Sequence, residues 1–221
     1  MERLMRRAIA AVCLAAILSA LAVAQEPSRF DSSGRVAGAP GTNLRDCKTI
    51  AEWADAATKG RARENRNQAC AALANASESA AVTAADIAEF ERALPALTAA
   101  TDTNIRGCGY TVIGTLKIAS GEALCLDVFK KNDTAVMQEA AAALGKLRSA
   151  KAIPVLFSSF PVKDRRNVLR SDCDTAIAEA LGQIGGADAK AALEKMAKRA
   201  EDHELKEAIA KSLDRIDGIG K

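Results

Sequence analysis

The sequence predicts an all-α protein, folded as a right-handed α-solenoid of four to five helical hairpins. Apolar residues recur at helical spacing along most of the chain, alanine is abundant, and convincing strand alternation is absent. A short pattern also returns at offsets of 31, 37 and 32 residues. Its copies are VIGTL at 112–116, ALGKL at 143–147, ALGQI at 180–184 and the weaker SLDRI at 212–216. A period in the thirties with two helices per unit is typical of stacked helical repeats.

Residues 1–24 are predicted to be a cleavable signal peptide. An arginine-rich start precedes an almost unbroken apolar run over 8–22, and Ala22 and Ala24 supply the small residues of a cleavage site before Gln25. The alternative is a retained membrane anchor, although the run is short for a membrane span. Cleavage predicts a mature protein in the bacterial periplasm or outside the cell, with no membrane contact afterwards.

The chain after the signal segment divides into a linker and a repeat body. Residues 25–43 are rich in Gly, Pro and Ser with almost no apolar content, which predicts a flexible linker. The repeat body spans 44–221. It opens with an amphipathic entry helix over 47–57, followed by a looser hairpin that includes 71–73 and 93–97.

The best-preserved unit is a hairpin predicted over 135–160. Val136 and Leu144 recur on one apolar face of its first helix. Gly145 lies inside that helix, where glycine costs about 1 kcal/mol, so close packing against a neighbouring helix is its predicted role. Pro154 falls in the first turn of the second helix, where proline is tolerated. Because one hairpin cannot bury its own faces, neighbours are expected to stack on it.

The pattern A-A-x-A-L-G-K-L, a short polar turn and A-I-P-x-L resemble the bacterial HEAT-repeat family, especially the short HEAT-like repeats of phycobilin lyases. The resemblance covers 104–200 and is weaker over 44–100. The turns depart from the family, since 148–151 and 185–188 lack the expected Asp-Pro or Asp-Glu. The resemblance implies an armadillo/HEAT-like superhelix whose second helices line a concave, protein-binding surface. It implies no reaction.

Two sets of charged residues are therefore candidates for contact with a partner protein. By the resemblance, the second helices would present Glu122, Asp127, Lys130, Lys190, Glu194 and Lys198. The longer spacing between the second and third copies of the pattern reflects a basic insertion within 161–170. It contains Lys163, Arg165, Arg166 and Arg170. Such a loop can bind an acidic partner, and the alternative is ordinary solvated surface.

Five cysteines remain after signal cleavage, and an oxidising compartment predicts disulfides between them. Cys108 and Cys125 fall in the two helices of one hairpin, and Cys47 and Cys70 would tie the entry helix to the first hairpin. The alternative for all four is buried free thiols that pack as small hydrophobes. Cys173 is left over, either as a core residue or as a thiol for intermolecular bridging or redox use.

No catalytic residue, cofactor or metal site is predicted. The chain has one histidine, His203, and no C-x-x-C spacing, so zinc sites and His-dependent nucleophiles lack their usual residues. Most of the formal charge of +3 lies in the signal segment, which leaves no electrostatic argument for nucleic-acid binding. The predicted function is a secreted, non-catalytic protein-binding or scaffold module. Two alternatives are an enzyme-accessory or ligand-handling protein related to phycobilin lyases, and an inhibitor or structural envelope protein.

Overall fold

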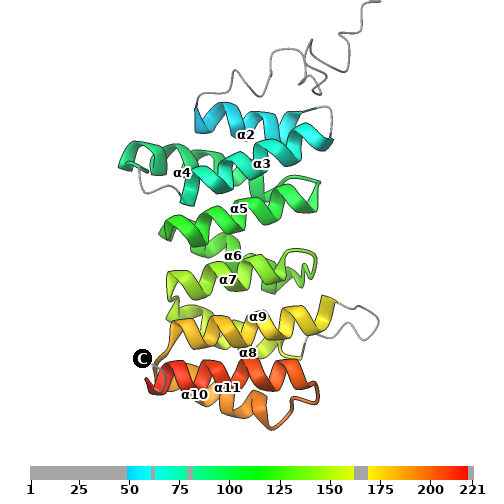
Figure 1. Ribbon diagram of the computed structural model, residues 1–221, viewed down its shortest axis with the longest axis vertical. Coiled ribbons are helices and arrows are strands. Elements are labelled where there is room, and N and C mark those ends of the chain that lie inside the picture. The colour runs from blue at the N-terminus through cyan, green and yellow to red at the C-terminus, as the bar shows by residue number, and fades with distance from the viewer. Residues whose placement is uncertain (1–48, 61–62, 79–81, 162–168, 219–221) are drawn as a thin grey trace, which may run out of the picture.

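A computed structural model describes residues 49–60, 63–78, 82–161 and 169–218 (Figure 1). These residues form ten α-helices and two short 3-10 helices and contain no strand, which confirms the predicted all-α class. The predicted signal peptide and linker lie outside the described residues. The helices are α2 (Ile50–Lys59), α3 (Arg63–Glu78), α4 (Ala84–Thr98), α5 (Thr103–Leu116), α6 (Glu122–Lys131), α7 (Met137–Leu147), α8 (Ile153–Ser159), α9 (Leu169–Ile184), α10 (Gly186–Ala197) and α11 (His203–Asp217), with 3-10 turns η1 (Ala119–Gly121) and η2 (Ala150–Ala152).

The helices form two rows along the long axis of the molecule (Figure 1). The first row consists of α3, α5, α7, α9 and α11, and each helix packs on the next in chain order. The second row contains α6, α8 and α10, which also contact one another in order, and begins with α4, which packs against α2 and α5. We call a first-row helix together with the second-row helix that follows it a layer.

The turn between the two helices of a layer repeats its backbone geometry. Lys117 and Arg148 end α5 and α7 in the left-handed conformation, each with φ of 52°. The following residues, Ile118 and Ser149, are extended, and a three-residue 3-10 turn then leads directly into α6 or α8. The two turns are 31 residues apart, the offset at which the sequence pattern repeats. The same backbone turn therefore recurs at the spacing of the repeated sequence pattern.

Glycine at the third position of the repeated pattern lets neighbouring layers approach closely. A Cβ atom on Gly114 would lie 2.8 Å from Ala143 Cα, and one on Gly145 would lie 2.9 Å from Ala180 Cα. Gly182 makes the corresponding approach to Ser212, at 2.6 Å from its Cβ. Each glycine thus faces the first residue of the next copy of the pattern. The close-packing role predicted for Gly145 is confirmed.

Small and aliphatic side chains fill the space between the rows. Val136 and Leu144, placed on one inner face by the sequence pattern, are both fully buried. Helix α7 begins one residue after Val136, which serves as its N-cap. Pro154 is the second residue of α8, within the first turn as predicted. Within the described part of the chain, no helix is long and apolar enough to cross a membrane.

Candidate binding surface

The second row carries the charged residues predicted to contact a partner. Helix α6 contributes Glu122, Asp127 and Lys130. Helix α10 contributes Lys190 and Glu194, and Lys198 is its C-cap residue. Helix α8 lies between α6 and α10 and contacts both. The remaining predicted residues, Lys163, Arg165 and Arg166, lie outside the described residues, and only the backbone of Arg170, in the first turn of α9, is described.

Three of the six second-row charges are engaged within the protein. Glu122 accepts a hydrogen bond from Ser149 Oγ at 2.6 Å and pairs with Lys151 Nζ at 3.3 Å, which links α6 to the next layer. Asp127 pairs with Lys131 at 2.6 Å within α6. Lys190 Nζ lies 2.6 Å from Asp217 Oδ1 of α11. The other three, Lys130, Glu194 and Lys198, are exposed on the surface.

Glu122 is expected to make folding stability depend on acidic pH. The hydrogen bond from the buried Ser149 hydroxyl, with help from Lys151, holds the pKa of Glu122 below its ordinary value. A lowered pKa stabilises the fold above the unfolded value, near 4.3, and this stabilisation is lost as pH falls through the folded value. We expect the contribution, about 1 kcal/mol, to disappear in Glu122→Gln. Urea unfolding at pH 7 and pH 3 measures it.

The matched control for Glu122 is Glu194→Gln on the exposed face of α10. It removes the same charge without removing a described interlayer hydrogen bond, so its loss of stability between pH 7 and pH 3 should match that of the native protein. Equal pH dependence of the native protein and Glu122→Gln would contradict the assignment.

A groove lies between α8 and α10. It has a volume of about 270 Å³, and its lining includes Ile153, Pro154 and Phe157 from the α8 side and Ala191 from α10. Asp188 and Lys195 supply one negative and one positive group in the same lining. Lys195 Nζ lies 5.8 Å from the centre of the Phe157 ring, within the range of a cation–π contact. The groove therefore offers apolar contact area with a charge of each sign.

A larger hollow, of about 620 Å³, lies where α8 ends and α11 begins. Its lining includes Phe160, Asp174, Arg199 and Asp202. The Arg199 guanidinium lies 5.2 Å from the Phe160 ring centre, and Asp202 caps α11 by accepting a hydrogen bond from the Leu205 amide at 3.0 Å. Arg199 and Asp202 thus already take part in local structure.

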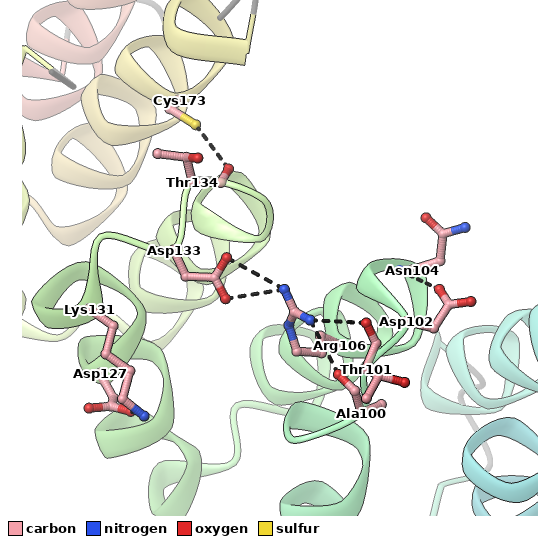
Figure 2. Close-up of polar contacts among 10 residues, drawn as sticks. All are labelled: Ala100, Thr101, Asp102, Asn104, Arg106, Asp127, Lys131, Asp133, Thr134 and Cys173. Carbon is pink, nitrogen blue, oxygen red and sulfur yellow. Dashed lines mark hydrogen bonds and ion pairs between the residues drawn. The ribbon is translucent and has the colours of Figure 1, made fainter. Parts of the chain in front are cut away.

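Arginine–aspartate pairs link the layers at the N-terminal ends of first-row helices, as Figure 2 shows for Arg106. Arg106 Nη1 donates to the carbonyl of Ala100 at 3.2 Å, and Nη2 reaches Asp133 at 3.2 Å. Arg66 repeats the arrangement one layer earlier, with the Gly60 carbonyl at 3.1 Å and Asp102 at 3.2 Å. Each arginine therefore holds the loop before its own helix and an acidic residue of the next layer.

These arginine–aspartate pairs, which we call clamps, were not predicted from the sequence. The partners are 36 and 27 residues apart, so no short motif contains both. An arginine near the start of a first helix, recurring at 66 and 106, is the signal that could have found them. Asp102 also caps α5 through the Asn104 amide, at 3.0 Å. The clamps are structural, since they hold adjacent layers together through charge-assisted hydrogen bonds.

Cys108 and Cys125 do not form the disulfide that the sequence predicted. Cys108 and Cys125 are free thiols, and Cys108 faces Cys70 of α3. Cys108 lies eight residues before the end of α5, whereas Cys125 lies three residues after the start of α6. At about 1.5 Å of rise per residue, this mismatch offsets them along the hairpin by several ångströms, beyond the reach of a disulfide between packed helices. The predicted partner of Cys70, Cys47, lies outside the described residues.

Cys125 and Cys173 are core residues. Cys125 is fully buried in α6, and burial raises its pKa to about 12. Cys173 is 2% exposed and its Sγ lies 3.8 Å from the Thr134 carbonyl oxygen (Figure 2). Burial, followed by the neighbouring Asp174 and Asp172, raises the pKa of Cys173 to about 11. Of the two interpretations of Cys173, core packing fits its burial.

The described residues contain no cluster of three or more His, Cys, Asp and Glu side chains able to hold a metal ion. His203 is the first residue of α11 and is exposed.

No family model matches the chain, and no curated protein matches it. Among solved structures, the chain is similar to a crystal structure of an engineered protein from the Northeast Structural Genomics Consortium. The identity is 18%, the match covers 79% of this chain and 84% of that one, and the TM-score is 0.52. A second engineered protein from the same consortium is 19% identical over 77% of this chain and 80% of its own, with a TM-score of 0.45. At 18% identity, the first similarity is one of fold alone.

Proposed function

We propose that this chain is a secreted, non-catalytic protein-binding or scaffold module, built as a right-handed α-solenoid of HEAT-like repeats. The observation that carries the binding role is the groove between α8 and α10, which combines apolar lining with Asp188 and Lys195. The proposed location, the bacterial periplasm or the extracellular space, follows from the signal peptide predicted over 1–24.

The solenoid part of the proposal is supported by repetition at two levels. The turns after α5 and α7 share their backbone geometry, and Gly114, Gly145 and Gly182 make equivalent approaches to the next layer. Units that contact only their neighbours and repeat every thirty-odd residues are the physical definition of such an array. One continuous row of second helices is then available to a partner.

The partly exposed apolar lining of the groove is suited to a side chain of a protein partner. Phe157 and Ile153 are each only partly buried, so an apolar side chain inserted between α8 and α10 would complete their burial. Asp188 and Lys195 would orient a partner segment that carries charges beside its apolar anchor.

Ala191→Glu tests this proposal. Ala191 is exposed on α10 and lines the groove, so the substitution fills the groove with a longer, charged side chain, which can also pair with Lys195 one turn later, without disturbing the core. We expect proteins captured specifically by the native chain from a bacterial envelope extract to decrease at least about tenfold, the equivalent of 1.4 kcal/mol. Quantitative mass spectrometry of the captured fraction measures the change.

The matched control is Ala142→Glu. Ala142 is an exposed helical alanine of α7, in the first row, so this variant carries the same substitution on a different face. It should retain the captured proteins at the native level. If Ala191→Glu retains them equally well, the groove is not the binding site.

A further inference from the structure

Two cysteine side chains meet between α3 and α5, in neighbouring layers. The Cys108 thiol donates to the Cys70 carbonyl oxygen at 3.3 Å, and the Cys70 thiol donates to the Asn104 carbonyl oxygen at 3.7 Å. Each thiol thus reaches a backbone carbonyl of the other helix, and the two thiols influence each other's pKa. Because Asn104 lies one helical turn before Cys108, all these contacts fall on one strip of the α3–α5 interface.

We propose that Cys70 and Cys108 form an oxidation site, at which the two thiols close to an intramolecular disulfide that ties α3 to α5. Both are free thiols in this structure. The other described cysteines lack such a partner: Cys125 is fully buried in α6, and the Cys173 thiol points to a backbone carbonyl. This inference does not depend on the proposed binding function.

The environments of the two thiols differ, and this difference determines which thiol reacts first. Cys70 is only partly buried, whereas Cys108 is 5% exposed. The neighbouring Cys108 lowers the pKa of Cys70, and the pKa of Cys108 is held well above its usual value, first by Cys70 and then by burial. Thiolates are the reactive form, so the accessible Cys70 starts the exchange.

The oxidant in this scheme is an external disulfide, such as oxidised glutathione. The Cys70 thiolate attacks one of its sulfurs, the external S–S bond breaks, and one glutathione thiolate leaves. Cys108 then attacks the Cys70 sulfur of the mixed disulfide, loses its proton to solvent, and releases the second glutathione thiolate. The protein dithiol loses two electrons and the external disulfide gains them. Capping of Cys70 in the first step also removes the main cause of the raised pKa of Cys108.

Peptide mapping of the purified full-length protein tests the site directly. The reduced protein is equilibrated with oxidised glutathione, alkylated under denaturing conditions and digested with trypsin. We expect peptides 67–92 and 107–117, which contain Cys70 and Cys108, to be recovered as one disulfide-linked pair. Cys125 and Cys173 should be recovered alkylated. Alkylation of both Cys70 and Cys108, a glutathione adduct that persists on Cys70, or a Cys47–Cys70 link would each overturn the proposal.

Thermal unfolding provides a second readout. A bridge between residues 70 and 108 closes a long loop, so the oxidised protein should unfold several degrees above the reduced protein, up to about 15 °C. Cys70→Ala should abolish this difference between the two redox forms, and Cys125→Ala should keep it. The readout is a difference within each variant, so any general destabilisation by the substitution cancels. An unchanged difference in Cys70→Ala would assign the stabilisation elsewhere.

Discussion

Gly114→Ala should destabilise the protein although alanine is the better helix former. The added methyl group would lie 2.8 Å from the backbone Cα of Ala143 in the next layer, so α5 and α7 must move apart. Overpacking of this kind costs about 1–3 kcal/mol, and the gain in helix propensity offsets at most about 1 kcal/mol of it. A net loss of about 1–2 kcal/mol corresponds to a fall in melting temperature of roughly 2–8 °C. Gly114→Leu should cost more.

Gly107→Ala supplies the control within the same helix. Its added methyl group would meet the carboxylate end of Glu139 at 3.3 Å, and a flexible side chain can move aside at little cost. The gain in helix propensity should then dominate, so this variant is expected to be neutral or more stable by up to about 1 kcal/mol. Chemical denaturation of both variants measures the contrast. Equal effects at the two positions would show that α5 and α7 are not in the close contact described here.

Leu144→Ala is expected to cost about 2–5 kcal/mol, the largest effect of any substitution considered for this chain. Leu144 is fully buried at the second position of the repeated pattern, in the middle layer of the stack. Truncation removes its burial and leaves a cavity that the surrounding helices can only partly close. Helix α7 also packs against both α5 and α9, so the loss weakens two interfaces. Against a typical stability of 5–15 kcal/mol, such a loss is severe.

Leu147→Ala is the matched comparison. Leu147 is the last residue of the same helix and only partly buried, so the same truncation should cost less than about 2 kcal/mol. Urea unfolding curves give both values. A cost for Leu147→Ala as large as that for Leu144→Ala would contradict the position of Leu144 at the centre of the core.

Helix content and repeat spacing were the features most accessible from the sequence. The spacing of Val136 and Leu144 matches the helical period and predicts one buried face, and both residues are fully buried. A glycine inside a helix predicts close packing at Gly145, and this residue faces Ala180 of the next layer. These features depend on the spacing of apolar residues and glycines along short stretches of the chain, and this spacing can be read directly from the sequence.

The cysteines show where local pattern fails. The spacing of Cys108 and Cys125 in the sequence predicts a disulfide within one hairpin. Because the two residues lie at different distances from the turn between α5 and α6, they are offset along the helix axes. The actual neighbour of Cys108 is Cys70, in the previous layer. Glu122 is a second example, because its hydrogen bond with Ser149 of the next layer joins residues 27 apart in the chain.

The helical class, the repeat offset and the glycine positions that allow layers to meet could all be predicted from the sequence. The contacts between side chains of different layers are evident only from the folded structure, including the Arg106–Asp133 clamp, the Cys70–Cys108 pair and the α8–α10 groove. The physical reason is that periodicity specifies which face of each helix is buried but leaves the axial register between helices open. That register depends on the simultaneous packing of small and large side chains across every interlayer contact.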